Sequence, residues 1–277
     1  MNNKIKIFVV YHKEAFTYTT DLYQPIQAGC DISNKTLNML HDNTGNNISK
    51  LNDILNEYTA LYWVWQNYKC EYIGLNHYRR YFFNNFNFKY FHKKIKFNLN
   101  KTLFYLKLKN NFPTFESYVK ISNTTKLVKY LNYFEDQLKS QLIDNIIFLA
   151  EPYSLGNRSV YEHFAKYHSN EHIDILYNLI KNDYPDFFAA FDKIMKQNYF
   201  SPFNMFICKW EYFDEYMNWI IPILNKLLSI IQLPDDPYQK RSLGFLAERL
   251  FNVFWEYKKN KGNIQIKYLP VLFVTNV

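Results

Sequence analysis

The sequence predicts an α/β fold with a mixed, mostly parallel sheet that has helices on both faces. Residues 4–11 (KIKIFVVY) end in a β-branched, mostly apolar run, which is typical of a strand buried inside a sheet. Residues 71–75 (EYIGL) are expected to form a second strand, and an amphipathic segment lies between the two. Strands that alternate with helices over the first half of a chain indicate a parallel sheet.

We expect one amphipathic helix between these two strands. It follows the polar loop 42–49 (DNTGNNIS), whose last residue, Ser49, is a suitable N-cap. Apolar side chains then recur at helical spacing to about residue 67: Leu51, Ile54, Leu55, Tyr58, Leu61, Tyr62 and Trp65. A helix that joins two strands in this way makes a parallel crossover, so both strands should end at the same edge of the sheet.

The remaining chain divides into further helices and strands, apart from one segment without a strong period. Residues 83–125 are rich in Phe, Asn and Lys, and we expect a mobile or irregular insert there. Helices are expected at 126–140, 159–168, 171–182, 185–197, 211–231 and 242–257, and extended segments at 144–150, 203–207 and 264–274. Since no internal repeat or linker divides the chain, residues 1–277 are expected to form a single domain with a helical C-terminal half.

The bulk properties indicate a folded, basic protein. The 277 residues are 48% hydrophobic and have a formal net charge of +8, which suits nucleic acid, an anionic membrane surface or a phosphorylated ligand as partner. No apolar run approaches the roughly 20 residues that span a bilayer, and no signal-peptide cleavage site follows the first strand. The three scattered cysteines, Cys30, Cys70 and Cys208, fit a reducing compartment, so we expect a cytoplasmic protein.

Several enzyme classes are excluded by the motifs that the sequence lacks. It contains no Gly-x-Gly-x-x-Gly and no phosphate-binding loop ending in Gly-Lys-Ser/Thr, which argues against dinucleotide enzymes and P-loop NTPases. His-Glu-x-x-His and paired Cys-x-x-Cys motifs are also absent, as is the Gly-x-Ser-x-Gly elbow of serine hydrolases.

Polar residues follow both predicted strands, and ligands of open α/β sheets bind at the carboxyl ends of the strands. The loop before the predicted helix adds backbone N–H groups, which favour anions at a helix N-terminus. We therefore expect a phosphate-bearing ligand to contact residues from these three places: Tyr11, His12, Lys13, Asn46, Asn47, Ser49, Lys50, His77, Tyr78, Arg79 and Arg80. Arg79 and Arg80 are adjacent on an extended segment, so their side chains should diverge and at most one should touch the ligand.

Two stretches of the sequence resemble a known bacterial family. They are residues 56–67 (NEYTALYWVWQN) and 72–82 (YIGLNHYRRYF), and further matches occur at 42–49, at 204–207 with Trp219 downstream, and at 241–250 (RSLGFLAERL). The family has long been described as a domain of unknown function. Its members occur in gene clusters for capsule, exopolysaccharide and lipopolysaccharide, and it is now grouped with glycosyltransferases that include galactofuranosyltransferases. The resemblance extends from Ile5 to about Tyr257.

This resemblance implies a fold, a reaction and partners. The fold would be the Rossmann-like, nucleotide-diphospho-sugar transferase type called GT-A, with a nucleotide-sugar-binding half at about 1–150 and an acceptor-side helical half at about 151–277. The reaction would move galactofuranose or another hexose from a UDP-sugar to a lipid-linked or oligosaccharide acceptor. The resemblance also implies a place at the cytoplasmic face of the inner membrane, as a peripheral protein, and no nucleic-acid partner.

A base is needed to accept the proton of the acceptor hydroxyl, and it is usually a carboxylate. Glu248, Asp235, Asp236 and Glu57 are the candidates, and Glu248 and Glu57 could instead form structural ion pairs. For the acceptor side the resemblance favours Asn204, Met205 and Arg241. His168 could also line the acceptor site, or it could cap the C-terminus of a helix. Because no Asp-x-Asp occurs, we predict no metal-binding residues and leave Mg²⁺ or Mn²⁺ open as a cofactor.

Two other functions remain open from the sequence. The net charge of +8 and the 50 Tyr and Phe residues would suit stacking on nucleic acid, although no nucleic-acid module motif occurs. The missing Asp-x-Asp would suit a non-catalytic scaffold in a polysaccharide assembly complex. The long apolar helix at 211–231 is expected to pack in the core, with a membrane-docking face as the alternative.

Overall fold

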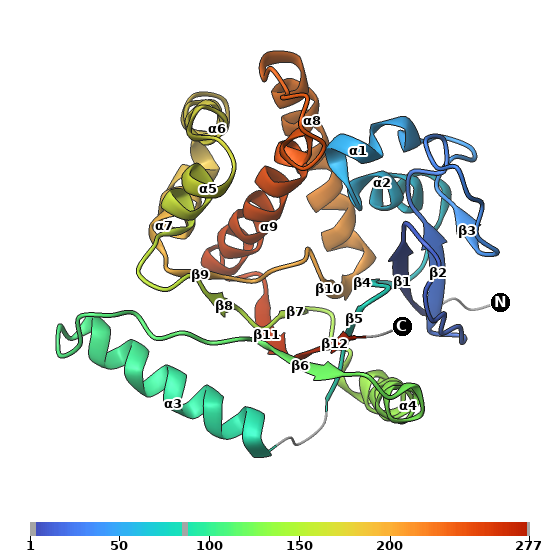
Figure 1. Cartoon of the computed structure of the whole chain (residues 1–277), viewed down its shortest axis with the longest axis horizontal. Helices are drawn as coiled ribbons and strands as arrows, with labels where there is room; N and C mark the ends of the chain where they lie inside the picture. The colour runs from blue at the N-terminus through green and yellow to red at the C-terminus, as the bar shows by residue number, and fades with distance from the viewer. Residues whose placement is uncertain (1–3, 85–87, 276–277) are drawn as a thin grey trace.

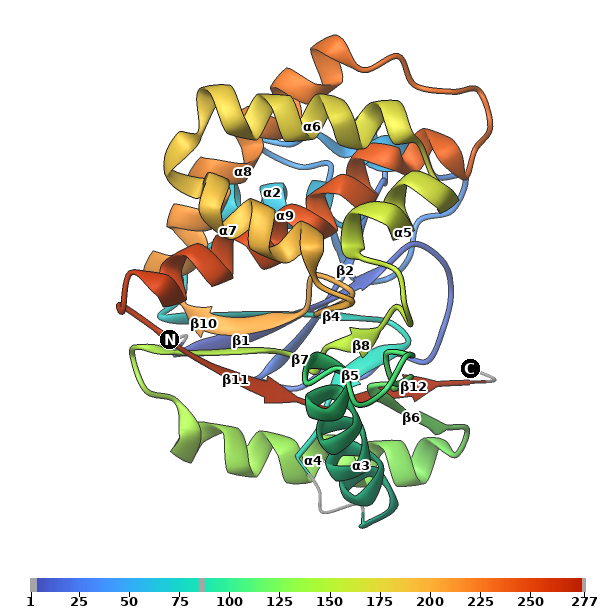
Figure 2. The same cartoon turned by 90° about the vertical axis from the view of Figure 1, so that its left-hand side faces the viewer.

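The predicted α/β fold is confirmed by a computed structural model, which describes residues 4–84 and 88–275 (Figures 1 and 2). Four parallel strands form one side of the central sheet: β1 (Ile5–Tyr11), β2 (Tyr23–Gln27), β3 (Leu40–His41) and β4 (Tyr72–His77). The sheet continues as β11-β7-β10-β4-β1-β2-β3 through β10 (Phe206–Lys209), β7 (Ile146–Ala150) and β11 (Gln265–Leu269). Strand β10 runs antiparallel to both of its neighbours, β4 and β7.

The expected parallel crossover brings the ends of three strands to one edge of the sheet. Val10 near the end of β1 is paired with His77 at the end of β4, and Tyr11 is paired with Gln27 at the end of β2. The residues that follow each strand therefore start from the same edge, as the sequence predicted.

Shorter strands extend the sheet beyond this edge. Arg80 in β5 (Arg80–Phe82) lies opposite His77, so the chain turns back directly after β4. Strand β12 (Val271–Val274) pairs with β5 and with β6 (Tyr118–Ile121), and β8 (Tyr153–Ser154) pairs separately with β9 (Tyr199–Phe200). The C-terminal strands β11 and β12 thus add to a sheet that the N-terminal strands begin.

Helices cover both faces of the sheet, most of them on one side (Figure 2). On that side lie α1 (Asn52–Leu55), α2 (Tyr58–Asn67), α5 (Val160–Tyr167), α6 (Asn170–Asp183), α7 (Pro185–Lys196), α8 (Trp210–Ile230) and α9 (Ser242–Asn260). The opposite face is covered by α4 (Thr124–Gln141), and α3 (Phe88–Tyr105) lies at the same side of the sheet.

Each face of the sheet has its own hydrophobic core. The larger core lies under α8 and α9, which bury Tyr216, Trp219, Phe251 and Trp255 against the sheet. The smaller core includes Leu127, Leu131 and other apolar residues of α4. The expectation that the long apolar helix packs in the core is confirmed by nine buried side chains in α8. Within the described residues, none of the helices has the length and apolar composition that a membrane crossing requires.

The single helix expected from Ser49 to residue 67 is wrong. The structure has a 3₁₀ turn (Ser49–Leu51), the short α1 and then α2, because Asn56 adopts a positive φ of 54° between the two helices. Ser49 does not cap a helix. Its hydroxyl donates to Asp42 Oδ1 at 2.6 Å, and Asp42 also accepts the backbone N–H groups of Gly29 and Cys30.

Two further expectations differ from the structure, and the short strands β2 and β3 were not predicted. Residues 83–125 are not irregular throughout, since α3 and β6 form there. Lysines alternate with aromatic side chains on the inner face of α3, which hides its helical period from an apolar count. The strand expected at 203–207 begins only at Phe206, because Phe203 and Asn204 have positive φ angles.

Gly244 marks a close approach between α9 and the turn after α1. A Cβ atom at this position would lie 1.9 Å from Asn56 Nδ2 and 3.3 Å from the carbonyl oxygen of Ile54. We therefore expect Gly244→Ala to displace Asn56 and to cancel the roughly 1 kcal/mol that alanine ordinarily adds in a helix. In urea unfolding, the free energy of unfolding should be no higher than that of the parent.

The double variant Gly244→Ala/Asn56→Gly is the control for this contact. Glycine removes the obstructing amide and suits the positive φ at position 56. In that background the Gly244→Ala change should raise the free energy of unfolding by about 1 kcal/mol. A gain of the same size in the parent background would show that the contact does not constrain α9.

Candidate functional site

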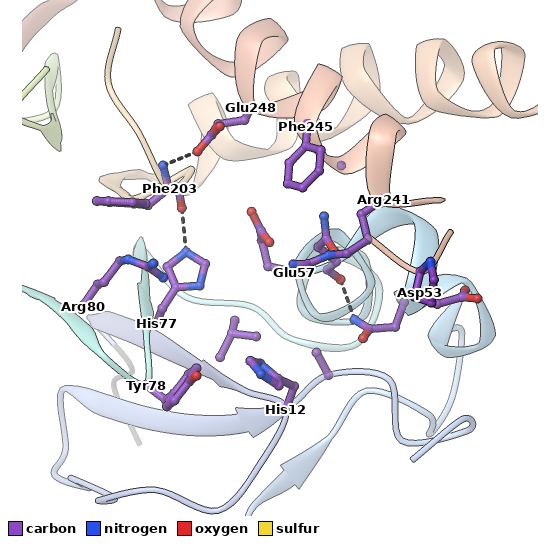
Figure 3. A pocket seen from close by; sticks show the side chains of 16 residues that line it. His12, Asp53, Glu57, His77, Tyr78, Arg80, Phe203, Arg241, Phe245 and Glu248 are labelled. Carbon is purple, nitrogen blue, oxygen red and sulfur yellow. Dashed lines mark hydrogen bonds between the residues drawn. The ribbon is translucent and has the colours of Figure 1, made fainter. Parts of the chain in front are cut away.

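A cavity of about 520 Å³ opens at the edge where β1, β2 and β4 end (Figure 3). Part of its wall consists of residues at or just after the ends of these strands. The rest comes from α1, β5, the turn before β10, and α9 with the turn that precedes it. The lining residues are Val10, His12, Ala28, Asn52, Asp53, Asn56, Glu57, His77, Tyr78, Arg80, Phe203, Pro237, Arg241, Gly244, Phe245 and Glu248. Both halves of the chain therefore contribute to one cavity.

The break between α1 and α2 aims Glu57 into this cavity. Asn56 has φ 54° and ψ −129°, and its carbonyl oxygen accepts a hydrogen bond of 2.6 Å from Asn52 Nδ2. Its side-chain oxygen accepts from Arg241 Nε at 2.5 Å, which ties the turn to the start of α9. With the turn fixed at both ends, the carboxylate of Glu57 points into the space between His77 and Phe245 (Figure 3).

A second strained turn, at Phe203 and Asn204, faces the first across the cavity. Its φ angles are 75° and 54°, which are uncommon for residues other than glycine. The backbone N–H of Phe203 donates to Glu248 Oε1 at 2.7 Å, and its carbonyl oxygen bonds to His77 Nε2 at 2.6 Å. Asn204 Nδ2 donates to Glu57 Oε1 at 2.5 Å. One turn thus bonds to three cavity side chains from β4, from the helix break and from α9.

Glu57 is the carboxylate best suited to accept a proton. Burial raises its pKa above the usual 4.5, while the hydrogen bond from Asn204 and the charges of Arg241 and Arg80 oppose that rise. Among the described side chains, Asn204 is the only one that hydrogen-bonds to it. A hydrogen bond from its own backbone also lowers the pKa. A carboxylate that burial has made more basic and that lines a cavity has the properties of a general base.

His77 is held neutral at the cavity wall. Burial, and after it the charge of Arg80, lowers its pKa from 6.5 to about 4. A neutral imidazole that bonds to the carbonyl oxygen of Phe203 through Nε2 must have its proton on that nitrogen. Nδ1 is then an unprotonated acceptor, and it lies on the side of the ring that faces the cavity (Figure 3).

Arg80 supplies a cation that no described acid neutralises directly. Its guanidinium lies 4.3 Å from the ring centre of Phe203 and 5.3 Å from that of Phe273, and within residues 4–84 and 88–275 it forms no ion pair. Burial lowers its pKa, whereas Glu248 and Glu57 raise it, and an arginine stays charged in proteins. Such a partly desolvated cation at the cavity favours an anionic ligand.

Glu248 has a different role from Glu57. Its Oε1 accepts from the backbone of Phe203, and its Oε2 accepts from Arg249 Nη1 at 2.8 Å. The side chain of Arg249 is only 3% exposed, so this is a largely buried ion pair. With both oxygens engaged, Glu248 anchors the turn at Phe203 to α9 rather than being free for a ligand.

The structure brings together seven of the residues proposed from the sequence: Glu57, Glu248, His12, His77, Tyr78, Arg80 and Arg241 all line the cavity. Arg79 and Arg80 diverge as expected. Only Arg80 lines the cavity, and the guanidinium of Arg79 lies 5.7 Å from the ring centre of Tyr78. Asn204 does not line the cavity but bonds to Glu57 from behind its wall.

The other residues proposed for the donor lie outside this cavity. Tyr11 is fully buried, and its hydroxyl is 3.1 Å from that of Tyr81. Lys13 and Lys50 are exposed away from the lining. The loop with Asn46, Asn47 and Ser49 is bonded instead to Asn67 of α2, to its own backbone and to Asp42. The polar groups of this loop, which follows β3, are therefore used to hold its own fold and do not face the cavity.

The remaining proposed residues are also placed elsewhere. Asp235 and Asp236 are exposed, and the Asp236 carboxylate accepts the backbone N–H groups of Tyr238 and Gln239. Met205 is fully buried in the smaller core. His168 ends α5, and its ring stacks on Phe245 at 4.2 Å from outside the cavity.

Sequence reasoning missed the residues that shape the cavity floor. Asn52 and Asn56 fall on the polar face of the single helix that was expected, so the apolar period gave no signal for the turn between them. Phe203 left no signal either, because a positive φ angle is uncommon at phenylalanine. Asn204 was proposed for the acceptor side, but its bond to Glu57 was not foreseen. Asp53, which forms a 2.5 Å ion pair with Lys240, was hidden for the same reason as Asn52.

No group of three or more His, Cys, Asp or Glu side chains in the described chain is arranged to hold a metal ion. The acidic residues of the cavity are each engaged: Asp53 with Lys240, Glu57 with Asn204, and Glu248 with Phe203 and Arg249. Whether Mg²⁺ or Mn²⁺ takes part stays a prediction.

The fold and the cavity define the class of the protein. The mixed sheet, with its antiparallel strand β10 and a cavity at the carboxyl ends of β1, β2 and β4, is a GT-A-like α/β arrangement. The chain belongs to the family described as "Domain of unknown function (DUF4422)", whose model matches residues 6–260. No curated protein matches it.

One solved structure is similar over nearly the whole chain. It is described as the apo structure of the WbbM bifunctional glycosyltransferase, with a TM-score of 0.82 and 25% sequence identity. The similarity covers 99% of this chain but 46% of that one, so this chain spans about half the length of its relative. The expected link to a glycosyltransferase-related family is thus confirmed at the level of family and fold.

The neutral state of His77 predicts how stability depends on pH. Its folded pKa of about 4 lies below the usual 6.5, so the unfolded state binds more protons between these values. Its contribution is complete above pH 6.5 and is lost as the pH falls to about 4. His77→Gln should flatten this part of the stability profile by up to about 1.4 kcal/mol per pH unit, measured by urea unfolding at several pH values.

The exposed His92 lies outside the cavity, and His92→Gln is the comparison variant for the loss of one histidine. His163 and His168 also have pKa values lowered to about 4 by burial, so part of the slope should remain in His77→Gln. An unchanged slope in His77→Gln would show that His77 is not held neutral in the folded protein.

Proposed function

We propose that this protein is a glycosyltransferase that moves a sugar from a nucleoside-diphosphate sugar to a hydroxyl group of a glycan. The observation that carries the proposal is the meeting of Arg80 and Glu57 in one cavity at the strand ends. The reaction needs a cation for the departing diphosphate and a base for the acceptor hydroxyl, and these two side chains supply them. The similarity to a bifunctional glycosyltransferase supports the same function.

The donor is proposed to be a UDP-sugar, with galactofuranose or another hexose as the sugar. Its diphosphate would lie beside Arg80, with Arg241 and His12 at the same cavity wall. Arg241 is oriented by its bond to Asn56, so the helix break that directs Glu57 also positions a second cation. The acceptor is proposed to be a lipid-linked or free oligosaccharide of a surface polysaccharide pathway.

The chemical step follows from these positions. The acceptor hydroxyl gives its proton to Glu57, and its oxygen forms a bond to the anomeric carbon of the donor. The bond between that carbon and the diphosphate oxygen breaks, and the diphosphate keeps the electron pair. Arg80 stabilises the charge that develops on the leaving group, where a partly desolvated cation acts most strongly.

An assay of nucleotide release tests the proposal. The purified protein is incubated with UDP-, GDP- and dTDP-sugars and a panel of oligosaccharide acceptors, with Mg²⁺, with Mn²⁺ and with EDTA. We expect acceptor-dependent release of UDP. Binding of UDP without turnover on any acceptor would favour a non-catalytic scaffold, and absence of both binding and turnover would refute the proposal.

Arg80 and Arg79 form a matched pair of variants for the donor site. Both are half-buried, and both have an Nε atom without a hydrogen-bond partner in the described chain, but only Arg80 lines the cavity. Arg80→Gln should weaken UDP binding about tenfold to a hundredfold, because it removes a charge-assisted phosphate contact. Calorimetric titration should show Arg79→Gln close to the parent. Equal losses in the two variants would move the diphosphate away from this wall.

Glu57 and Glu248 should separate into a base and an anchor. Glu57→Gln keeps the hydrogen bond from Asn204 in reach but removes the proton acceptor, so turnover should fall by about 10²- to 10⁴-fold with UDP affinity retained. Glu248→Gln loses its charge pair with Arg249 and should lower the melting temperature. Turnover that survives in Glu57→Gln but is lost in a folded Glu248→Gln would reverse the two roles.

A further inference from the structure

One face of helix α3, its inner face, packs against the rest of the protein. Lys94 forms a 2.6 Å ion pair with Glu151, and Phe97 is buried against Phe112 and Phe115. Lys101 lies 4.5 Å from the ring centre of Tyr199. These side chains recur every three or four residues, so they form one stripe along the helix.

The outer face of α3 is a second stripe, and it is apolar but exposed. Phe91, Ile95 and Leu99 are spaced four residues apart, and they are 47%, 52% and 60% exposed. Leu106 continues the line just past the helix and is 62% exposed. We call these four residues the outer stripe. Large aliphatic side chains aligned in this way on a helix surface mark an interaction site rather than scattered surface residues.

The segment of the chain that contains the outer stripe is basic, although Glu116, just after it, lies in the same hollow as Lys93 and Lys96. Between residues 72 and 115 the sequence has nine Lys and Arg residues and no Asp or Glu, while the whole chain has 33 Lys and Arg against 25 Asp and Glu. The rest of the chain therefore has 24 basic and 25 acidic residues, and this segment accounts for the net charge of +8. Lys96 is exposed one helical turn from Leu99, and the exposed Lys107 and Lys109 follow the helix, whereas Lys93 lies on the side of Phe97.

We propose that α3 binds the surface of an anionic lipid bilayer through the outer stripe together with Lys96, Lys107 and Lys109. An amphipathic helix with aliphatic side chains on one face and flanking lysines lies in the interface, with its apolar side chains among the lipids and its cations at the headgroups. A second copy of the chain would present the same lysines, and like charges would oppose a symmetric contact. An anionic lipid surface can bury the apolar side chains of the outer stripe and attract the lysines at the same time.

The position of α3 leaves the cavity accessible. In Figures 1 and 2, α3 lies below the sheet, whereas α1 and α9, which line the cavity, lie above it. Binding to a bilayer through α3 would hold the protein at the surface without covering Glu57 or Arg80. The inference therefore rests on α3 alone and does not depend on the proposed reaction.

Vesicle flotation tests the proposal directly. The full chain is mixed with vesicles of phosphatidylcholine alone or of phosphatidylcholine with phosphatidylglycerol. We expect binding to the vesicles that contain phosphatidylglycerol, and Ile95→Glu should weaken it at least about tenfold, since it removes an apolar contact and adds a like charge to the headgroups. The control is Ile143→Glu, because Ile143 is also 52% exposed but lies outside α3.

A second pair of variants tests the charge. Lys96→Gln/Lys107→Gln should lower the affinity for anionic vesicles about tenfold or more. Lys129→Gln/Lys181→Gln makes the same change in net charge at exposed sites outside residues 72–115 and should have little effect. Melting temperatures and UDP titration of all variants should match the parent, which separates this result from the outcome of the transferase assay.

Three results would overturn the proposal. One is equal binding to both kinds of vesicle or to neither, and another is an equal loss in the α3 variants and their controls. The third is a change of oligomeric state in Ile95→Glu, measured by light scattering without vesicles, which would assign the outer stripe to a contact between copies.

Discussion

The turn at Phe203 and Asn204 is the constraint on which the cavity depends. It precedes β10, which lies between β4 and β7 and therefore fixes the turn to the middle of the sheet. From there it bonds to His77 on β4, to Glu248 on α9 and to Glu57 at the helix break. These three groups come from distant parts of the sequence, and no other contact in the described chain joins all of them. Loss of the turn's geometry would separate the proposed base from the wall that bears Arg80.

This arrangement lowers the free energy of unfolding, and the unfavourable terms are concentrated around the cavity. Of the four non-glycine residues with positive φ in the described chain, Asn56 and Phe203 line the cavity and Asn204 lies directly behind its wall. Each such conformation costs about 1–3 kcal/mol. Glu57 and Arg80 are also partly desolvated there. The packed core beneath α8 and α9, with Tyr216, Phe251 and Trp255 fully buried, supplies the stability that offsets these terms. Strain held in place by a rigid core produces a preorganised site, which is what electrostatic catalysis requires.

The sequence predicted the elements whose apolar periods are regular. Strands β1, β4 and β7 and helices α4 to α9 were foreseen because their buried faces are uninterrupted, and the parallel crossover followed from them. The site was predicted only where residues directly follow those strands, as for His12, His77 and Arg80. The residues proposed for the donor from the polar loop at 46–50 lie outside the cavity, because the carboxylate of Asp42 draws Gly29, Cys30 and Ser49 together. A loop rich in Asn and Gly suits such internal bonding as well as it suits a ligand.

The basic residues of the protein occur in two different environments, the cavity and the exposed surface of α3. The acid-free segment 72–115 contains both Arg80 and the lysines of α3, so one stretch of sequence provides two anion-attracting regions. Their environments differ, because Arg80 is enclosed by Phe203 and Phe273 whereas Lys96 is exposed. Salt screens exposed charges over about 8–10 Å and screens desolvated ones much less. The lysines of α3 therefore provide a long-range attraction that ionic strength modulates, and Arg80 provides a short-range contact that it barely changes. A basic composition alone could not distinguish these two roles, which depend on how deeply each cation is placed.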